Sequence, residues 1–220
     1  MDSIITIDGP TGSGKSTVSR SLARQLNYQY LDTGAMYRAV GIALLKADVK
    51  LQDIKEIEKI CLSIDIKFVR GDEQTKILLD GVDITKEIRD PDIDLFASNV
   101  SALDIVRKAM VKLQRKEGAK GRLVAEGRDM GTVVFPEAKH KFYIDALLEE
   151  RVTRRFSERR KRGESVLREN VKEDLIKRDY QDMNRNHSPL KPAKDAKIID
   201  TTGLDVTGVV KKIIEEIKKN

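Results

Sequence analysis

The sequence has 220 residues, of which 40% are hydrophobic, 35% are charged and 5% are aromatic. This length supports one α/β domain, or a core domain with inserted segments, and the composition excludes a disordered chain. A single cysteine, Cys61, excludes an intramolecular disulfide framework and favours a reducing compartment. There is no apolar run of about 18 residues and no amino-terminal targeting pattern, so we expect a cytoplasmic protein that does not contact a membrane.

The net charge of the chain is +6, from 42 Lys and Arg against 36 Asp and Glu. A basic chain can bind nucleic acid or small polyanions, and charge alone does not choose between them. No aromatic-rich RNA-binding pattern accompanies the basic residues, and the arginines cluster near phosphate motifs. We therefore expect small anionic substrates and no nucleic-acid partner.

The amino-terminal part of the chain predicts a strand, a glycine-rich loop and a helix. Ile4 to Asp8 is a short β-branched run that ends at Gly9. After the glycines, Val18, Leu22 and Leu26 follow one another at the four-residue spacing of a helix face.

The middle of the chain predicts helices with a small β-rich insertion between them. A helix is predicted from Met36 to Leu45. Between about residues 62 and 90, the segments IDIKFV and TKILLDGVDI are β-prone, and their Asp80-Gly81 pair is a strong hairpin signal. Helical spacing then resumes with Val100, Leu103, Val106, Met110 and Leu113.

The carboxy-terminal part predicts strands at RLVAEG, KFYIDA and KIID. From Glu149 to Arg162 the chain is charged nearly all round, which predicts an exposed helical flap. Further helices are predicted over roughly Val166–Met183 and Val206–Ile217. Strands that alternate with helices predict an α/β fold with a mostly parallel sheet, covered on both faces, and ligands at the carboxyl ends of the strands.

The segment after the first strand matches the phosphate-loop pattern G-x-x-x-x-G-K-[ST] in the required strand-to-helix context. Glycines let backbone N–H groups turn toward phosphate oxygens, Lys15 supplies charge to the β- and γ-phosphates, and Ser16 offers a hydroxyl to Mg²⁺. The alternative is a Gly-Ser-rich turn with a solvated lysine. The residues predicted to bind ATP are Gly9, Pro10, Thr11, Gly12, Ser13, Gly14, Lys15, Ser16 and Thr17.

The segment LDTGAMYR, residues 31–38, is a polar turn that opens a helix with Arg38 one turn inside. Such an arrangement can hold a second anion. The alternative is a helix cap at Asp32 or Thr33 with Arg38 on the surface.

The segment EGRDMGT, residues 126–132, follows a predicted core strand and should emerge at the ligand edge of the sheet. Glu126 can bind Mg²⁺ or its waters. The alternative is a tight glycine turn with a surface ion pair between Arg128 and Asp129, which would contribute little.

Three charged residues near the end of a predicted helix, Arg178, Asp182 and Arg185, recur at spacings of four and three. This spacing places them on one helical face, where they could grip a sugar phosphate. The alternative is a solvated helix surface, which is the common reading of a charge run.

Taken together, these segments resemble the bacterial cytidylate kinase family, whose motifs appear here in order as GPTGSGKST, LDTGAMYR, ASNVSALDIVR, EGRDMGTVVFP and RDYQDMNRNHSPL. The resemblance spans about the whole chain, and LDTGAMYR and GRDMGTVVFP are its specific parts. It implies a P-loop kinase core with a β-rich nucleotide-binding insertion and a helical lid. The implied reaction transfers the γ-phosphoryl group of ATP, with Mg²⁺, to CMP or dCMP.

The resemblance also implies a role for each site residue. The residues that would read the cytosine are Ser98, Arg107 and Asp129. The residues that would line the monophosphate site are Thr33, Tyr37, Arg38, Arg128 and Arg185. Arg178 and Asp182 would hold the sugar and the nearby phosphate. The lid arginines are Arg151, Arg154, Arg155 and Arg159. The catalytic set is Lys15, Arg38, Arg128, Arg155 and Arg185, and the predicted metal ligands are Ser16 and Glu126.

The same resemblance divides the chain into functional parts. Residues 1–32, 118–147 and 184–220 form the core, residues 33–117 bind the monophosphate, and residues 148–183 form the lid with its adjoining helix. The lid is expected to close when both nucleotides are bound, which would exclude water. We expect a monomer.

Two other functions are compatible with a phosphate loop. One is a kinase for another small acceptor, and the GRDMGT segment argues against it. The other is a P-loop switch or a nucleic-acid-binding ATPase, and the sequence contains neither an NKxD guanine-reading motif nor a helicase-like extension.

Overall fold

The computed structural model describes residues 4–69 and 75–219 of the chain. The chain divides into two compact units, one formed by Met1–Leu31 with Gly118–Asn220 and the other by Asp32–Glu117. Residues 70–74 of the predicted β-rich insertion lie outside the described residues. The functional division of the chain into core, monophosphate-binding region and lid stays a prediction.

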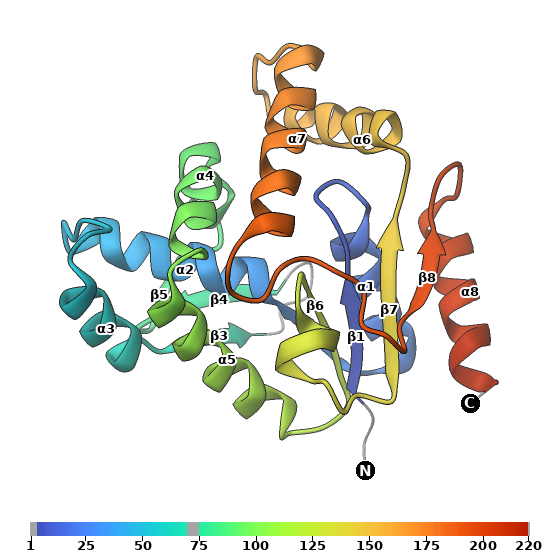
Figure 1. Ribbon diagram of the computed structural model, residues 1–220, viewed down its shortest axis with the longest axis horizontal. Coiled ribbons are helices and arrows are strands. Elements are labelled where there is room, and N and C mark those ends of the chain that lie inside the picture. Colours follow the sequence, from blue (N-terminus) through green and yellow to red (C-terminus); the bar gives the residue numbers. More distant parts are fainter. Residues whose placement is uncertain (1–3, 70–74, 220) are drawn as a thin grey trace. The chain divides into compact units, whose positions relative to one another are not determined.

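The first unit is built on a five-stranded sheet in the order β2-β6-β1-β7-β8 (Figure 1). The central strand β1 (Ile4–Asp8) pairs in parallel with β6 (Leu123–Gly127) and with β7 (His140–Asp145). Strand β7 pairs in parallel with β8 (Lys197–Asp200), and β2 (Gln29–Asp32) forms the opposite edge. The four core strands predicted from the sequence and their parallel pairing are confirmed.

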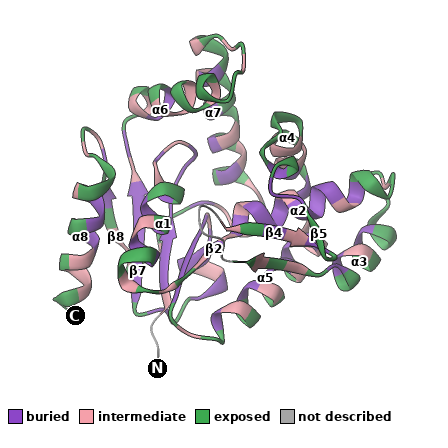
Figure 2. Cartoon of the chain, turned by 180° about the vertical axis from the view of Figure 1, so that it is seen from behind, coloured by how far each residue is buried: buried purple, intermediate pink, exposed green. Residues whose placement is uncertain are grey.

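Two helices, α1 (Lys15–Leu26) and α8 (Val206–Lys218), pack on one face of this sheet. Because side chains alternate between the two faces along a strand, Ile5 and Ile7 of β1 both lie on this face. Figure 2 shows the central strands β1 and β7 mostly buried and the outward side of α8 exposed. The core between helices and sheet consists of Ile5, Ile7, Val18, Leu22, Ala23, Val124, Phe142, Ile144, Ile199, Val209, Val210 and Ile213.

The opposite face of β1 carries Thr6 and Asp8, and there the chain forms a short π-helix, η2 (Met130–Val134). Met130 and Val134 of this helix are buried. The segment GRDMGT therefore contains a wide helical turn, where a tight glycine turn was the alternative prediction. Because η2 follows β6 directly, it begins at the carboxyl edge of the sheet.

Helices α6 (Leu148–Lys161) and α7 (Arg168–Asn184) follow β7 beyond its carboxyl end (Figure 1). They pack on each other through a small apolar cluster around Val152, Val171 and Leu175. The prediction of a charged helix is confirmed for α6, but only six of its 14 residues are exposed and another six are half-buried. The predicted exposure is wrong for Val152 and Arg151, which are buried because α7 covers that side of the helix.

The second unit contains helices α2 (Thr33–Lys46), α3 (Ile54–Ser63), α4 (Pro91–Val100) and α5 (Asp104–Gly118), together with a short 3₁₀ helix, η1 (Glu87–Arg89). Helix α2 packs against α4. Helix α2 confirms the helix predicted from Met36 to Leu45, while α3 was not predicted.

The helical spacing that was predicted to run on from Val100 is interrupted in the structure. Helix α4 ends at Val100 and α5 begins at Asp104. Between them the backbone N–H groups of Ala102 and Leu103 bond to carbonyls only three residues back, at 3.1 and 3.2 Å. Such tightened bonds are typical of a helix end, so one apolar pattern covers two helices.

The β-rich insertion forms a separate three-stranded antiparallel sheet of β3 (Ile66–Val69), β4 (Lys76–Leu79) and β5 (Val82–Asp83). Asp80 and Gly81 connect the last two strands with φ angles of 49° and 81°. Two consecutive positive φ values are the requirement of a tight two-residue hairpin turn, so the predicted hairpin is confirmed.

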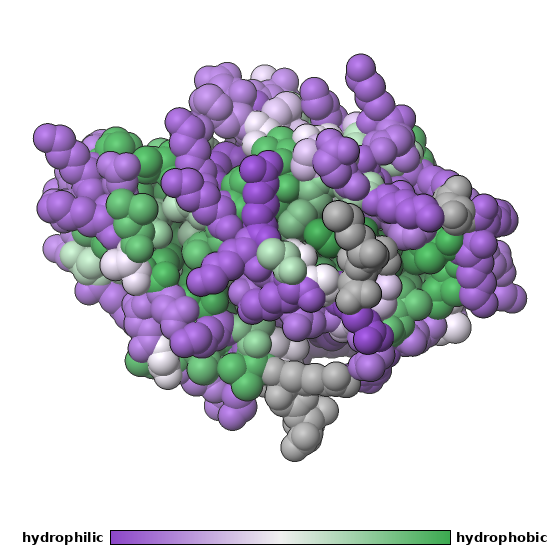
Figure 3. Space-filling model, turned by 90° about the horizontal axis from the view of Figure 1, so that it is seen from below, coloured by the Kyte–Doolittle hydropathy of each residue, from purple (hydrophilic) through white to green (hydrophobic). Residues whose placement is uncertain are grey.

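Hydrophilic side chains project over much of the face shown in Figure 3, and hydrophobic side chains form scattered patches between them. This agrees with a chain in which 35% of residues are charged. Among the helices of residues 4–69 and 75–219, none has both the length and the apolar character needed to cross a membrane.

Neighbouring isoleucines of β8 allow a matched test of the core. Ile199 is 8% exposed in the sheet core, whereas Ile198 is 65% exposed on the other side of the strand. We expect Ile199→Ala to lower the free energy of unfolding by about 2–4 kcal/mol, because it removes buried methyl groups and leaves a cavity. Ile198→Ala should cost less than about 1 kcal/mol. Equal costs in urea unfolding experiments would contradict this assignment of faces.

Candidate active site

The phosphate loop connects β1 to α1, and its conformation requires glycine at two positions. Gly9 and Gly12 have φ angles of 153° and 78°. A Cβ atom at Gly9 would lie 2.0 Å from the Ile144 carbonyl oxygen, and one at Gly12 would lie 2.9 Å from the Arg151 carbonyl oxygen. Any side chain would clash with the backbone that approaches these positions, and this steric constraint explains why both residues are glycine.

Lys15 begins α1 and is buried beneath the loop. Its Nζ donates a hydrogen bond to the Pro10 carbonyl oxygen at 2.9 Å. Burial, followed by repulsion from Arg128, lowers the pKa of Lys15 to about 7, against the opposing charge of Glu126. A negatively charged ligand would stabilise the protonated form of Lys15 and raise its pKa again.

Glu126, at the end of β6, receives hydrogen bonds on both carboxylate oxygens. Ser16 Oγ donates to its Oε2 at 2.9 Å, and the Tyr30 hydroxyl donates to its Oε1. The Arg20 guanidinium lies 5.6 Å from the centre of the Tyr30 ring. A hydroxyl and a carboxylate side by side are oxygen ligands of the kind that Mg²⁺ takes, together with waters and substrate phosphates. The residues predicted for the metal therefore fit it.

Arg128 connects the phosphate loop with α7. Its Nε donates to Asp182 Oδ2 and its Nη2 donates to Thr11 Oγ1, both at 2.8 Å. The alternative of a surface pair between Arg128 and Asp129 is wrong, because Asp129 is buried and Arg128 is largely covered. Burial raises the pKa of Asp182, but the charges of Arg128, Arg178 and Arg185 outweigh burial and lower it.

The predicted charged face of α7 needs one correction. Arg178 and Asp182 lie in the helix, but α7 ends at Asn184 and the backbone of Arg185 is extended. Arg185 still approaches Asp182 at 3.5 Å, and its Nε donates to the Ser188 carbonyl oxygen at 2.7 Å. The alternative of a solvated surface is wrong for this face, since Asp182 is buried.

In the second unit, Asp32 caps α2 and Arg38 lies one turn inside. Asp32 Oδ1 accepts a hydrogen bond from the Ala35 backbone N–H at 2.8 Å. Arg38 forms ion pairs with Asp32 at 3.5 Å and with Asp94 of α4 at 3.4 Å. The cap predicted as an alternative is thus present. It does not place Arg38 on the open surface, because only 20% of its side chain is exposed.

Helices α2 and α5 bring Tyr37 and Arg107 together. The Arg107 guanidinium lies 5.5 Å from the centre of the Tyr37 ring, and its Nη1 donates to the Ser101 carbonyl oxygen at 3.1 Å. Arg107 is buried, although it is a long charged side chain. Ser98 lies in α4 and is half-buried, and Thr33 is buried at the start of α2.

The residues predicted for the acceptor nucleotide are shared between the two units. The first unit contains Arg128, Asp129, Arg178, Asp182 and Arg185, and the second contains Thr33, Tyr37, Arg38, Ser98 and Arg107. Within each unit, buried or half-buried arginines lie beside polar or aromatic partners. Their individual roles stay predictions.

The four lid arginines differ in what they contact. Arg151 is buried and donates to the Thr11 carbonyl oxygen at 3.1 Å, and it pairs with Asp179. Arg154 donates to the Ser13 carbonyl oxygen at 3.3 Å. Both therefore bind the backbone of the phosphate loop. Arg155 donates to Glu158 at 3.0 Å, and Arg159 pairs with Glu164 and Asp174. The catalytic role of Arg155 stays a prediction.

Sequence reasoning missed several acidic residues of the site. Asp179 accepts a hydrogen bond from the Thr11 backbone N–H at 3.3 Å, and its position three residues before Asp182 was a usable signal. Asp8 was visible as a carboxylate at the end of an apolar strand. The pairing of Asp94 with Arg38 and of Tyr30 with Glu126 had no signal in the sequence, because both join separate segments.

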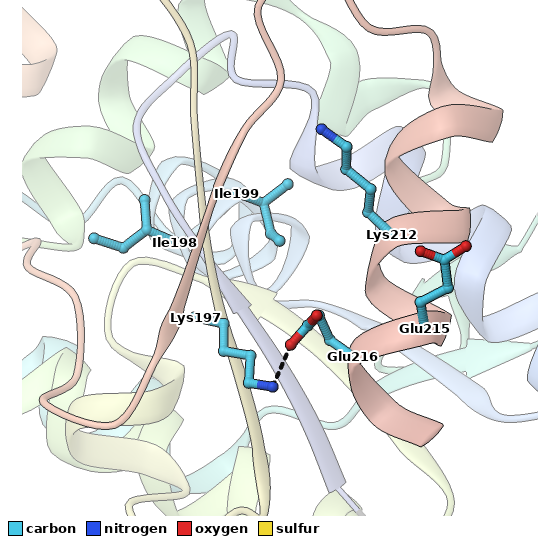
Figure 4. A pocket seen from close by; sticks show the side chains of 6 residues that line it. All are labelled: Lys197, Ile198, Ile199, Lys212, Glu215 and Glu216. Atoms are coloured by element: carbon cyan, nitrogen blue, oxygen red, sulfur yellow. Dashed lines mark hydrogen bonds and ion pairs between the residues drawn. The ribbon is translucent and has the colours of Figure 1, made fainter. Parts of the chain in front are cut away.

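The predicted site is distinct from a shallow hollow of about 350 Å³ between β8 and α8 (Figure 4). There the Lys197 side chain points toward Glu216, with which it forms an ion pair. The hollow contains none of the residues predicted for ATP or the acceptor, and it is lined by Lys197, Ile198, Ile199, Lys212, Glu215 and Glu216.

Solved structures similar to this chain support the fold. One is an uncharacterized protein from Eubacterium ventriosum, with a TM-score of 0.56 and 17% identity, and each chain is covered completely. Another is a protein from Thermus thermophilus, with a TM-score of 0.52 and 18% identity over 99% of this chain and 97% of that one. At these identities the likeness concerns the α/β fold alone.

Sequence comparisons identify the family. The model of the family described as cytidylate kinase matches residues 5–219. A cytidylate kinase of Carboxydothermus hydrogenoformans is 49% identical over 98% of both chains, and one of Geobacter sp. strain M21 is 44% identical over 98% of this chain and 93% of its own. The chain belongs to the cytidylate kinase family, the ATP-dependent phosphotransferases that phosphorylate CMP and dCMP.

Proposed function

We propose that this cytidylate kinase moves the γ-phosphoryl group of Mg·ATP in line onto a phosphate oxygen of CMP or dCMP. Main-chain amides of the phosphate loop would hold the donor, and guanidinium groups would hold the acceptor. The observation that carries the proposal is Arg128, whose guanidinium is bonded both to Thr11 of the phosphate loop and to Asp182 of α7.

The donor half is supported by the loop and by Lys15. Backbone N–H groups at the start of α1 are not used inside the helix and can bind phosphate oxygens. Lys15 is buried directly under this loop, where its charge would act on the β- and γ-phosphates. The proposed ATP site therefore combines the fixed dipoles of the backbone N–H groups with the side chain of one buried lysine.

The acceptor half is supported by arginines whose charges are already oriented. Arg128, Arg178 and Arg185 surround Asp182 in the first unit, and Arg38 pairs with two aspartates in the second. An ionised acceptor phosphate requires no general base, so positioning and charge neutralisation are the main demands. His140 is therefore not needed as a base. It is buried at the amino end of β7, whereas the phosphate loop follows the carboxyl end of β1.

Ser16 and Glu126 would hold the magnesium ion, as their adjacent oxygens suit a hard cation. When bound, Mg²⁺ neutralises charge on the β- and γ-phosphate oxygens. Tyr30, which donates to Glu126, would keep that carboxylate directed toward Ser16.

The lid is proposed to exclude water from the transferred group. Arg151 and Arg154 of α6 donate hydrogen bonds to carbonyl oxygens of the phosphate loop, so movement of α6 would displace the backbone at Thr11 and Ser13. Arg155 pairs with Glu158, and Arg159 pairs with Glu164 and Asp174, so either arginine would have to exchange these carboxylates for a phosphate group. We also propose a monomer, the default for a small kinase, that acts in the cytoplasm, which rests on the single cysteine and on the sequence pattern of the chain.

The proposed function is tested by an assay of several nucleoside monophosphates with Mg·ATP. We expect CMP and dCMP to be the best acceptors, and Asp129→Ala to reduce the preference for CMP over UMP, because a buried carboxylate suits the amino edge of cytosine. The measurement is kcat/KM for each nucleotide. If the variant kept the full preference, Asp129 would not read the base; if a different acceptor were best, the substrate proposal would fall.

Lys15→Ala tests the donor site. We expect kcat to fall by about two to four orders of magnitude, because an oriented charge that stabilises the transferred group is lost. Lys55→Ala, which changes an exposed lysine of α3, is the matched control and should keep full activity. Unchanged turnover in Lys15→Ala would refute the assignment.

The lowered pKa of Lys15 predicts a proton linked to ATP binding. Because burial lowers the pKa of Lys15 to about 7, a substantial fraction of Lys15 is neutral near pH 7.5 in the free protein. The negative charge of Mg·ATP raises this pKa, so we expect the uptake of about half to one proton on binding. Calorimetry in two buffers of different ionisation enthalpy measures this uptake.

The matched variant for this linkage is Lys15→Arg, whose side chain is always protonated. It should bind Mg·ATP with little proton uptake. Binding heats of the unmodified protein that do not depend on the buffer would contradict the linkage.

A further inference from the structure

Asp8 is a buried carboxylate at the end of the central strand, and only 3% of it is exposed. Its neighbour Ile7 faces the apolar core under α1 and α8, so Asp8 faces the other side of the sheet, toward η2. A carboxylate without water needs compensating partners, otherwise its burial is strongly unfavourable. What it bonds to therefore indicates why it is there.

The partners of Asp8 are two backbone N–H groups at the start of η2. The Met130 N–H donates to its Oδ1 at 2.9 Å, and the Gly131 N–H donates to its Oδ2 at 2.8 Å. The first N–H groups of a helix have no partner inside the helix. Asp129, the residue at the usual capping position, makes no side-chain capping bond. The cap is supplied instead from a strand about 120 residues earlier in the chain.

Each end of this connection leads to the proposed active site. Asp8 directly precedes Gly9, where the phosphate loop begins, and Met130 directly follows Arg128 and Asp129. A second connection runs between the same two segments, because Arg128 Nη2 donates to Thr11 Oγ1 at 2.8 Å. The phosphate loop and the segment after β6 are thus joined at two points.

We propose that Asp8 is a positioning residue for phosphoryl transfer: by capping η2, it sets the place of Arg128 and Asp129 relative to the phosphate loop. The inference rests on the proposed roles of Arg128 and Asp129 at the acceptor nucleotide. Small displacements of groups that align the two substrates are costly in rate, so a residue that never touches substrate can limit turnover.

The donor site does not depend on Asp8 to the same degree. Beyond Gly9, the phosphate loop is held by bonds from Lys15 to Pro10, from Arg154 to Ser13, and from Thr11 to Asp179. Loss of the Asp8 carboxylate should therefore affect the acceptor side more than ATP binding. This difference separates a positioning role from a general loss of stability.

The test is Asp8→Asn, assayed at pH 8. Burial raises the pKa of Asp8 to about 7, against the Gly131 and Met130 amides, so the carboxylate is ionised at this pH. Asparagine turns an N–H₂ group toward one of the two amide donors and loses that bond. We expect kcat/KM for CMP to fall at least about tenfold, through kcat and the KM for CMP. The Kd of Mg·ATP, measured by calorimetry, should change less than about threefold.

The matched control is Thr6→Val on the same face of β1. The Thr6 hydroxyl is buried without a hydrogen-bond partner among the described residues, and it lies 3.1 Å from where a Cβ of Gly131 would be. Its replacement changes the same region of packing but leaves the cap intact. Both kinetic constants should stay within about twofold of those of the unmodified protein.

A second variant covers the case in which Asp8→Asn does not fold. Gly131→Ala would place a Cβ 3.1 Å from Thr6 Oγ1, 3.3 Å from Lys141 Cδ and 3.4 Å from Asp8 Oδ2, which crowds the first turn of η2 beside the cap. It should raise the KM for CMP and lower kcat in the same pattern, with a smaller effect.

The outcomes separate the two proposals. If Asp8→Asn is folded and keeps kcat and the KM for CMP within twofold, or if Gly131→Ala does so when Asp8→Asn is unfolded, the positioning role is overturned. A fall in melting temperature with both constants unchanged would also overturn it. If the unmodified protein does not phosphorylate CMP, the proposed function has failed instead.

Discussion

The site depends on the largely covered guanidinium of Arg128, which is bonded to Thr11 of the phosphate loop and to Asp182 of α7. A guanidinium group has five donors in a rigid plane, so one side chain can bridge separate segments without losing its orientation. Because one guanidinium makes both bonds, a change in the position of α7 is transmitted through Arg128 to Thr11 of the phosphate loop. The geometry of the loop and of the acceptor side are therefore physically connected in the first unit.

The charges around this arginine form a balance that favours anionic ligands. Lys15 is buried and is repelled by Arg128, which lowers its pKa, whereas the aspartate between the arginines, Asp182, has a lowered pKa of its own. Arg128 and Arg178 lie close enough to Lys15 to lower its pKa, and the charges of Glu126 and Asp182 act in the opposite direction. A ligand that brings several negative charges would be favoured next to these cations, which is the physical argument for the proposed triphosphate and monophosphate sites.

Much of the local structure could be predicted, because it depends on neighbours in the chain. The run from Ile4 to Asp8 has the pattern of a buried strand, and the Asp80-Gly81 pair forms the hairpin that its φ requirements indicate. Local patterns failed where tertiary contacts decide: the apolar spacing through Val100 hides a break between α4 and α5, and Arg185 lies beyond the helix that its spacing suggested. Val152 is buried although its helix is highly charged, because α7 covers it.

By itself, the sequence determined the class of the fold, the phosphate loop and the family. Each depends on local patterns or short motifs, in which the structure or the chemistry requires particular residues in a particular order. Only the tertiary structure decided which charges become partners. Hydrogen bonds join residues that are far apart in the sequence: Asp8 to the start of η2, Tyr30 to Glu126, and Arg128 to Thr11 and Asp182. Such pairs follow from the order of strands in the sheet and from the helices packed at its edge, and no local pattern in the chain records them.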